Sequence, residues 1–280
     1  MNAPDQRNQL LRDGFCVVPG VLDARMLAET RAVVDRLIAS QPKEHFERNR
    51  STGSMIDVLA DSFMAKLIAL PSALSALTAL GFDKPKFASG YIISKPPRSP
   101  QLFWHQDWWG WDDPGSYRDE PQQLFLMYYL VDTNRQNGCL RVIPGSHRKR
   151  HPLHDQLATA HTDEIRRAAN MDNAAFQAAP GEKEVGVRAG ELVIGDARVL
   201  HAAHANQTDT QRTVITLWYY PDFENASDPL RAAMLQKWQQ HQQHFPTVDF
   251  AKLLPASLVP QCDGKAEPLK PNRNPNAALR

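Results

Sequence analysis

The sequence predicts a mainly β fold, an antiparallel sandwich or barrel with helices on its flanks. Between residues 84 and 221, short runs of alternating apolar and polar residues are separated by Pro, Gly, Asn or Asp. This alternation is typical of half-buried strands, and helices do not alternate with the strands as they would in a parallel α/β sheet. Residues 5–81 and 222–280 show helical spacing instead. We therefore expect one domain over residues 1–280, with a β core between two helical regions.

The N-terminal region, residues 5–81, begins with a helix, a strand and a second helix. A helical stretch follows Gln6, and the apolar run Gly14–Gly20 predicts a brief strand. The longer helix is expected to have Asp23 as its N-cap, because apolar residues then recur three or four positions apart as far as Leu37.

The rest of this region predicts a loop and two more helices. Residues 41–54 are polar and charged, which indicates a loop. Met55–Leu80 predicts two helices that meet near Pro71, because proline disfavours helical conformation in the residue before it. The apolar run Leu67–Leu80 is too short and too interrupted to predict a membrane span.

Seven strands are expected in the β region. They are Lys86–Ser94, Gln101–Asp107, Gln122–Asp132, Cys139–Ile143, Glu184–Arg188, Glu191–Gly195 and Thr213–Tyr219. A long insertion, Lys149–Gly181, interrupts them and contains a short predicted helix at Thr162–Asn170. Insertions of this length often cover a binding site, but surface decoration explains the segment equally well.

The C-terminal region predicts one helix and a loose tail. Apolar residues from Leu230 to Trp238 form a rough helical stripe. His241 and His244 follow three residues apart in a Gln-rich segment, which favours a solvated helix face over a metal-binding pair. Gln261–Arg280 contains Pro, Asn and Lys but few apolar residues, as loose tails do.

Composition excludes several classes of function. The 32 Lys and Arg residues balance 31 Asp and Glu, so no strong field of either sign points to nucleic acid or to a cationic partner. Three widely spaced cysteines, Cys16, Cys139 and Cys262, argue against a disulfide framework, and the first residues lack a signal-peptide pattern. We expect a cytoplasmic protein that binds a small molecule and neither nucleic acid nor a membrane; its oligomeric state is left open.

The pair His105 and Asp107 is the first candidate for chemistry. It lies in an aromatic stretch, Leu102–Trp111, on a predicted strand, where side chains two residues apart point to the same face. The pair can therefore offer a nitrogen and a carboxylate oxygen to one metal ion. Such pairs also arise by chance, and two unrelated polar residues on a surface strand are the simpler interpretation unless a third ligand exists.

Candidates for the third ligand lie in Gly190–Thr213, which carries His201, His204 and Arg212. Two histidines and one carboxylate on one face of an ion leave three positions open, as in non-haem Fe(II) oxygenases. A bidentate 2-oxo acid can fill two of these positions and O₂ the third. Arg212 has the planar guanidinium suited to the far carboxylate of that acid.

Together these motifs resemble the phytanoyl-CoA dioxygenase family of Fe(II)- and 2-oxoglutarate-dependent oxygenases. The resemblance rests on the His105-x-Asp107 pair, on Asn137–His147 with its Asn-Gly-Cys-Leu and Pro-Gly-Ser-His sequences, and on the run from His201 to Arg212. Gly14–Gly20 followed by a helix is also similar to the opening of the family. The resemblance covers about residues 8–221 and implies a double-stranded β-helix, or jelly roll, over about residues 84–221.

The resemblance also implies roles for individual residues. It places iron on His105, Asp107 and His201, and the far carboxylate of 2-oxoglutarate on Arg212. His204 then becomes either a residue near the pocket entrance or an exposed histidine.

One position departs from the family pattern. Many members have a hydroxyl residue two positions after the second histidine ligand, where this chain has Ala203. Thr208 and Thr213 are the candidates to replace that hydroxyl in binding the co-substrate.

Asp107 bears on the reaction type. Related enzymes that halogenate have a small residue at this position, so the aspartate implies hydroxylation or another oxidation of an unactivated C–H bond. By resemblance, 2-oxoglutarate and O₂ are converted to succinate and CO₂.

The tryptophans near the pair have two expected locations. Trp104 and Trp108 alternate with His105 and Asp107 and are expected in the core. Trp109 and Trp111 follow the strand, where lining a substrate pocket and packing in the core are equally good interpretations.

Two other functions remain open. One is a non-catalytic jelly-roll binding protein with a structural metal, and the other is a cupin-like metal-dependent hydrolase or isomerase. Neither needs an arginine eleven residues after the histidine ligand, so Arg212 favours the oxygenase. The substrate cannot be inferred from these residues.

Overall fold

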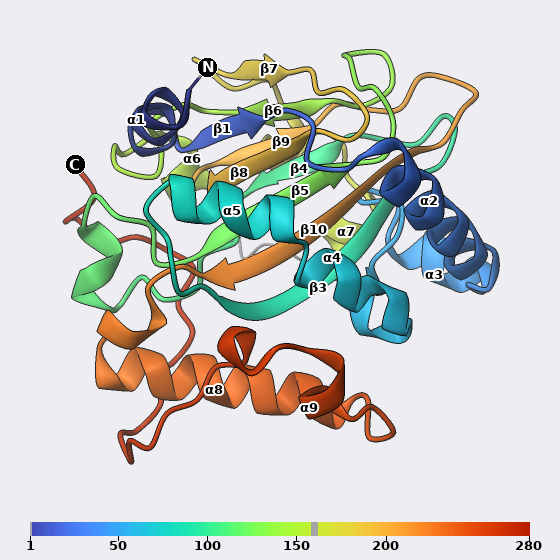
Figure 1. Cartoon of the computed structure of the whole chain (residues 1–280). Coiled ribbons are helices and arrows are strands. Elements are labelled where there is room, and N and C mark those ends of the chain that lie inside the picture. Colours follow the sequence, from blue (N-terminus) through green and yellow to red (C-terminus); the bar gives the residue numbers. More distant parts are fainter. Residues whose placement is uncertain (1, 158–161) are drawn as a thin grey trace.

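Two antiparallel sheets that face each other form the centre of the protein (Figure 1). The computed structural model describes residues 2–157 and 162–280. The six-stranded sheet has the order β1-β8-β5-β10-β3-β2, and the four-stranded sheet has the order β4-β9-β6-β7. The strands are β1 Phe15–Val18, β2 Ile56–Asp57, β3 Lys86–Lys95, β4 Leu102–His105, β5 Leu124–Tyr129, β6 Leu140–Val142, β7 Lys183–Val185, β8 Leu192–Asp196, β9 His201–Ala203 and β10 Arg212–Tyr220.

Helices lie around this sandwich. They are α1 Ala3–Asp13, α2 Ala24–Ala39, α3 Lys43–Arg48, α4 Ala65–Ile68, α5 Pro71–Ala79, α6 Leu153–Gln156, α7 Asp163–Arg166, α8 Asp228–Gln243 and α9 Phe250–Leu253. As predicted, Asp23 caps α2 through its side chain, which accepts a hydrogen bond from the Met26 amide. In Figure 1, α4 and α5 cover the six-stranded sheet, and α8 lies below the β3 end of the sandwich.

The strands of the six-stranded sheet use their two faces differently. On the outer face, Leu126 of β5, Ile194 of β8 and Ile215 of β10 pack in one large core with Leu67 and Leu77 of the helices. The inner face turns toward the four-stranded sheet. This alternation is the period-two pattern that predicted the strands, and the antiparallel sandwich is confirmed.

Two predictions for the N-terminal region are wrong. Residues 41–54 contain the short helix α3 rather than loop alone. The first of the two helices expected in Met55–Leu80 starts with a strand instead, because Ile56 and Asp57 pair with Ile92 and Tyr91 at the edge of the six-stranded sheet. Pairing with β3 decides the conformation here and overrides the local helical spacing. The break at Pro71 is confirmed, since α5 begins there.

The stretch Ser62–Ala79 has a mean hydropathy of 1.4, and by length and composition it would suffice to cross a membrane. In this fold it is divided between a 3₁₀ turn at Ser62–Met64 and the helices α4 and α5. Leu67, Ile68 and Leu77 are fully buried in the core of the sandwich. The apolar side chains of this stretch therefore pack against the sheet.

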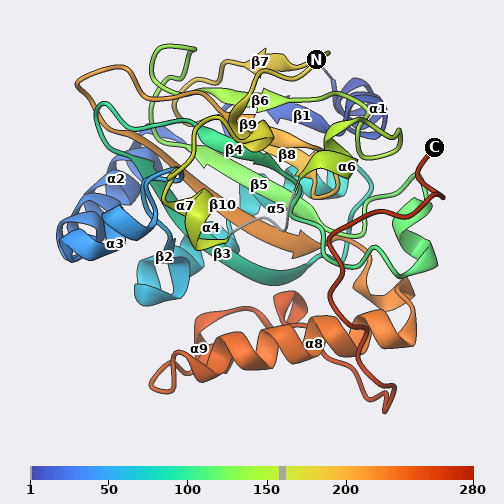
Figure 2. The same cartoon turned by 180° about the vertical axis from the view of Figure 1, so that it is seen from behind.

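The insertion after β6 packs along the four-stranded sheet (Figure 2). Phe176 makes an edge contact with Phe103 of β4, and the carbonyl of Gln177 accepts a hydrogen bond from the Trp104 indole at 2.9 Å. Residues 158–161 of the insertion lie outside the described residues. The predicted helix at Thr162–Asn170 is shorter than expected, four residues with Thr162 as its N-cap.

The prediction of a loose C-terminal tail is wrong. Asn272 forms a parallel bridge with Gly110, and Leu279 is only 3% exposed. The Leu269 amide also donates a hydrogen bond to the Pro229 carbonyl at the start of α8. The tail has few apolar residues, so its docking depends on backbone hydrogen bonds that hydrophobic periodicity does not reveal.

Candidate metal and co-substrate site

Strand pairing brings the two candidate histidine ligands together. In the register of β4 with β9, His105 lies directly opposite His201, and their ring centroids are 4.2 Å apart. Both side chains are buried, with 6% and 2% of their surface exposed. Residues almost a hundred positions apart thus meet on the inner face of the four-stranded sheet.

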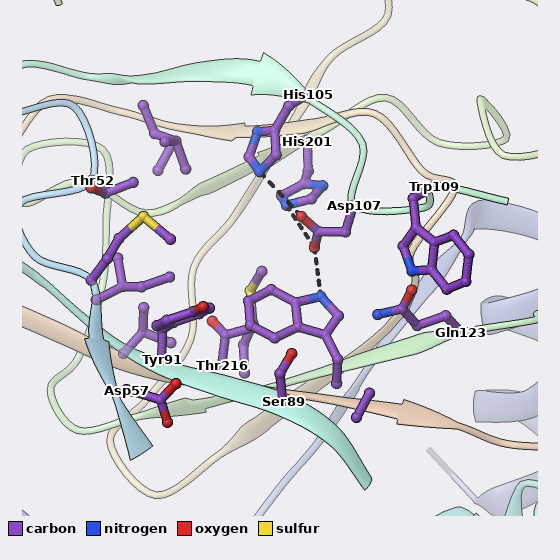
Figure 3. A pocket seen from close by; sticks show the side chains of 18 of the residues that line it. Thr52, Asp57, Ser89, Tyr91, His105, Asp107, Trp109, Gln123, His201 and Thr216 are labelled. Atoms are coloured by element: carbon purple, nitrogen blue, oxygen red, sulfur yellow. Dashed lines mark hydrogen bonds and ion pairs between the residues drawn. The ribbon is translucent and has the colours of Figure 1, made fainter. Parts of the chain in front are cut away.

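Asp107 is the third member of the candidate metal site, but it does not lie on a strand as predicted. β4 ends at His105, so Asp107 lies in the segment after the strand, where its amide donates to the Ala197 carbonyl at 2.8 Å. Its Oδ1 is 3.5 Å from His105 Nε2, and its Oδ2 is 3.7 Å from His201 Nε2. Figure 3 shows the three side chains converging, with one ligand atom of each within 4.8 Å of the others.

The second nitrogen of each histidine is held by the backbone. His105 Nδ1 lies 3.0 Å from the Phe103 carbonyl, and His201 Nδ1 lies 3.1 Å from the Val199 carbonyl. A proton on each Nδ1 donates to its carbonyl, which leaves the Nε2 lone pair for a metal ion. The rings are therefore oriented for ligation by contacts two residues back in the chain.

Trp218 is a functional candidate that sequence analysis missed. Its indole Nε1 donates a hydrogen bond to Asp107 Oδ2 at 2.9 Å (Figure 3). Trp218 is on β10, six residues after Arg212, and the even spacing places both on the inner face. The even spacing of Arg212 and Trp218 could have been recognised in the sequence. The proximity of β10 to Asp107 could not.

A cavity of about 670 Å³ opens next to the three ligands, between the two sheets. Residues of β3, β5 and β10 line one side of it, and His105, His201 and Ala203 line the other. Its volume lies within the range of about 300–1,000 Å³ that is usual for small-molecule pockets.

Arg212 lies in this cavity as a buried cation. It is 4% exposed, and its Nε has no hydrogen-bond partner among the described residues. Burial lowers the pKa of Arg212, and the neighbours that act on its charge are Tyr129 and Cys139 rather than a carboxylate. A buried guanidinium without a carboxylate is costly unless an anion binds to it. The arrangement fits the far carboxylate of 2-oxoglutarate.

Lys95 is a second buried cation beside Arg212, opposite it in the register of β3 with β10. Its ammonium group donates to the carbonyls of Ser51, at 2.6 Å, and Pro100. Burial, and then the charge of Arg212, hold the pKa of Lys95 well below its ordinary value. These two carbonyls bind the ammonium group, so its main contacts are with the backbone.

Thr208 and Thr213, which were expected to replace the hydroxyl that is missing at Ala203, do not line the cavity. Ala203 does line the cavity, but Thr213 is on the opposite face of β10 from Arg212, and its hydroxyl lies 2.6 Å from that of Ser94. Thr208 donates to the side chain of Asn206 in the turn before β10. Neither threonine lines the cavity. The hydroxyl of Tyr129, which does line it and interacts with Arg212, is the better candidate.

Of the three residues predicted to contact the substrate, only one lines the cavity. Trp109 lines the cavity, whereas Trp111 is fully buried in a cluster with Trp108 and Tyr117 and does not reach it. His204 also lies outside the cavity lining, because its Nε2 contacts Glu184 Oε1 at 3.0 Å on the other side of β9. The structure thus keeps Trp109 and removes Trp111 and His204 from the substrate candidates.

One wall of the cavity comes from segments that were predicted to be solvated or loose. Lys237 and His241 of α8, His244 just after it and Arg273 of the tail line this wall. His241 Nε2 lies 2.6 Å from Asp57 Oδ2, which ties α8 to β2. The prediction that both histidines are solvated is therefore wrong for His241, whereas His244 is exposed as predicted. The insertion also contributes to the lining through Arg166 of α7.

A family model described as "Phytanoyl-CoA dioxygenase (PhyH)" matches residues 10–214. This range includes the three convergent side chains and Arg212 and covers most of the chain. The chain belongs to the phytanoyl-CoA dioxygenase family. It is therefore an enzyme of the iron- and 2-oxoglutarate-dependent oxygenases, and the predicted family and enzyme class are confirmed. The cofactors predicted for it, iron, 2-oxoglutarate and O₂, are those of this class.

Curated relatives within the family act on different compounds. Ectoine dioxygenase of Nocardia farcinica (strain IFM 10152) is 25% identical over 230 residues, which are 76% of each protein. A probable α-ketoglutarate-dependent hypophosphite dioxygenase of Stutzerimonas stutzeri is 28% identical over 128 residues, 46% of this chain and 42% of that protein. The names of these relatives span substrates as different as ectoine and hypophosphite.

Solved structures share the fold. The α-ketoglutarate-dependent epimerase SnoN from nogalamycin biosynthesis is 25% identical with a TM-score of 0.59, over 78% of this chain and 80% of SnoN. HygX of Streptomyces hygroscopicus, solved with nickel and 2-oxoglutarate, is 21% identical with a TM-score of 0.58, over 78% and 87% of the two chains. These similarities confirm the predicted jelly roll.

Proposed function

We propose that this enzyme hydroxylates an unactivated C–H bond of a small organic molecule, while 2-oxoglutarate and O₂ become succinate and CO₂. The observation that carries the proposal is Arg212, a buried guanidinium without a carboxylate partner among the described residues, in the same cavity as His105, Asp107 and His201. A structural metal site would leave this cation uncompensated.

Each residue has a separate task in this proposal. His105, Asp107 and His201 would hold the iron, and Arg212 would bind the far carboxylate of 2-oxoglutarate. When bound, the iron and 2-oxoglutarate would supply electrons that activate O₂ for oxidation of the substrate.

The surroundings of these residues keep the site ordered and dry. Trp218 fixes the direction of the Asp107 carboxylate through the hydrogen bond to Oδ2. Met127, Leu140 and Val214 are apolar parts of the lining that exclude water from the reacting atoms.

Retention of a carboxylate at position 107 favours hydroxylation. Asp107 can occupy a coordination position that a halogenating enzyme keeps free for halide. Because SnoN is an epimerase, product analysis must separate the outcomes. Incorporation of one ¹⁸O atom from ¹⁸O₂ into the product would support hydroxylation, and an isotope-free isomer would contradict it.

Binding of the cofactors can be tested before any substrate is known. Anaerobic addition of Fe(II) and 2-oxoglutarate should give the weak visible charge-transfer band of the chelate. Asp107→Ala should abolish the band. Absence of the band in the native enzyme would contradict the proposal.

Arg212→Gln should weaken 2-oxoglutarate binding about 100-fold, because it removes a bidentate charge-assisted contact worth about 3 kcal/mol. Titration of the same band with 2-oxoglutarate measures this change. Arg36→Gln, at an exposed ion pair with Asp61 on the far side of α2, is the matched control and should bind normally. Equal affinity in Arg212→Gln would remove this residue from co-substrate binding.

A further inference from the structure

The cavity holds an excess of positive charge. Among the residues that the structure describes, its lining includes the basic side chains of Lys95, Arg166, Arg212, Lys237 and Arg273 but only two carboxylates, Asp57 and Asp107. If the proposed function holds, the two charges of Fe(II) balance the two carboxylates of 2-oxoglutarate. The excess then remains on the substrate side of the cavity, where a small molecule has to compensate it.

Most of these charges already have partners. Asp57 is bound to His241, and Asp107 is one of the three candidate metal ligands. Arg212 is assigned to 2-oxoglutarate, and backbone carbonyls hold Lys95. Arg166, Lys237 and Arg273 have no such assignment, and of these three Lys237 and Arg273 lie near Trp109.

Lys237 and Arg273 come from different elements and meet near Trp109. The ammonium group of Lys237 lies 4.6 Å from the centre of the Trp109 ring. Arg273 lines the same cavity, and burial and the charge of Arg273 both lower the pKa of Lys237. Burial also lowers the pKa of Arg273, although the charge of Asp107 opposes this shift. Neither side chain forms an ion pair with a carboxylate among the residues that the structure describes.

The backbone fixes this pair in place. Arg273 Nη1 donates to the Asp107 carbonyl at 3.0 Å, and the Gln106 side-chain amide donates to the Arg273 carbonyl at 2.7 Å. The Asn272 amide donates to the Trp109 carbonyl at 2.7 Å. The tail therefore holds the guanidinium and the indole next to the segment that carries the metal ligand.

We propose that Lys237, Arg273 and Trp109 form a subsite for an oxyanion, a carboxylate or phosphoryl group, of the organic substrate. This inference rests on the proposed function, because it places the anion beside the proposed iron site. Among the described residues, neither cation forms an ion pair with a carboxylate, so an oxyanion would stabilise both. The guanidinium also retains donors for it beyond the one used on the backbone. Lys237 and Arg273 lie beyond residues 10–214, so the two cations of the subsite come from the C-terminal part of this chain.

The subsite can be probed with simple anions. The full-length protein is loaded with Ni(II) and saturating 2-oxoglutarate, which occupies Arg212 without turnover. Propionate and methylphosphonate are then titrated by calorimetry, with propionamide as the neutral counterpart. We expect at least one anion to bind and propionamide not to bind. Binding of neither anion, or equal binding of propionamide, would overturn the subsite.

Substitutions of Lys237 and Arg273 test whether these two residues bind the anion. Lys237→Met and Arg273→Gln should each weaken anion binding about tenfold, the change expected for loss of one charge-assisted contact, and Lys237→Arg should retain it. Lys252→Met, at an exposed lysine of α9, is the matched control. Unchanged affinity in both Lys237→Met and Arg273→Gln would overturn the assignment. Lys237→Met leaves the backbone contacts of the tail intact, so a loss of anion binding in this variant reports the loss of the charge and not a disturbed fold.

The same samples separate the two proposals. If 2-oxoglutarate does not bind to the Ni(II) protein, the proposed function fails. If 2-oxoglutarate binds and the anions do not, only the subsite fails. A screen for substrate-stimulated succinate release should then find its substrates among acids, and oxidation of a neutral compound at equal kcat/KM by the native enzyme and the Lys237→Met variant would contradict the subsite.

Discussion

At the scale of single residues, hydrogen bonds from neighbouring groups set the orientation of the candidate metal ligands. The imidazoles of His105 and His201 are fixed through Nδ1 by carbonyls two residues earlier in the chain, which is a local feature. Asp107 instead depends on Trp218, a residue 111 positions away. The carboxylate is therefore the ligand whose orientation is most sensitive to the tertiary structure.

Trp218→Phe tests this dependence. The variant keeps an aromatic ring but removes the hydrogen bond to Asp107 Oδ2, so metal affinity should fall about tenfold, as is usual when such a supporting contact is lost. Competition of the protein with a chelator for Ni(II) measures the change. Trp111→Phe, in the core beside Tyr117, is the control and should bind the metal normally. Equal affinities in both variants would show that the indole nitrogen does not orient the ligand.

His154 offers a prediction on pH and stability. Burial lowers its pKa from the ordinary 6.5 to about 4, although its hydrogen bond with the His151 carbonyl opposes the shift. Between pH 6.5 and 4 the unfolded chain binds the proton and the folded chain does not, so stability rises with pH in this window and is lost as pH falls through it.

Urea unfolding at pH 7 and at pH 4.5 measures this contribution. The native protein should lose about 2 kcal/mol more of its unfolding free energy than His154→Gln as the pH is lowered. Because both proteins contain the same carboxylates, their difference isolates the histidine. Parallel losses in the two proteins would contradict a depressed pKa for His154.

At the scale of elements, the register of the sheets sets the shape of the site. Phe125 of β5 lies opposite Gly195 of β8, and its ring is 5.1 Å from that of His201. A Cβ atom at position 195 would come within 2.1 Å of the Phe125 ring. A glycine is needed here because the ring that supports a candidate ligand occupies the space of a side chain.

Gly195→Ala should push Phe125 toward His201 and reduce Ni(II) affinity, with a loss of about 1–3 kcal/mol of stability from overpacking. The double variant Gly195→Ala/Phe125→Leu has room for the methyl group and should recover part of both losses. Chelator competition and thermal unfolding measure the two effects. Gly264→Ala, in the exposed part of the tail, is the control. A Gly195→Ala protein with native affinity would show that Phe125 does not position His201.

At the scale of the whole molecule, two C-terminal segments complete a cavity that starts in the jelly roll. α8 and the tail add Lys237, His241 and Arg273 to its lining. In Figure 2 the tail, drawn in red, runs from the side of α8 toward α6. The chain thus closes its site with residues outside the part matched by the family model.

Hydrogen exchange tests whether the tail is docked. The amides of Leu269 and Asn272 donate to the carbonyls of Pro229 and Trp109 and should exchange much more slowly than those of the exposed Lys265 and Glu267. Mass spectrometry after short labelling times resolves the two pairs. Equal, fast exchange along residues 261–280 would mean that the tail does not cover the site.

The sequence by itself predicted the class of the fold and the residues of the candidate site. Alternating apolar residues predicted the antiparallel sheets, and the resemblance to the family implied that His201 is a metal ligand and that Arg212 binds the co-substrate. The parity of β10 could also have excluded Thr213, since it is adjacent to Arg212 and must face the other way. These features follow from residue type and from distances of a few residues.

The tertiary structure alone decided which segments enclose the cavity. The tail lacks the apolar pattern that predicts packing, and the histidines of α8 lie in a polar segment, yet backbone hydrogen bonds and the contact of His241 with Asp57 bring both to the site. Trp218 and Asp107 likewise come into contact only because β10, in the six-stranded sheet, faces the segment that follows β4 in the four-stranded sheet. Polar contacts between residues far apart in the chain have no local periodicity, so they became visible only when the sheets and helices were in place.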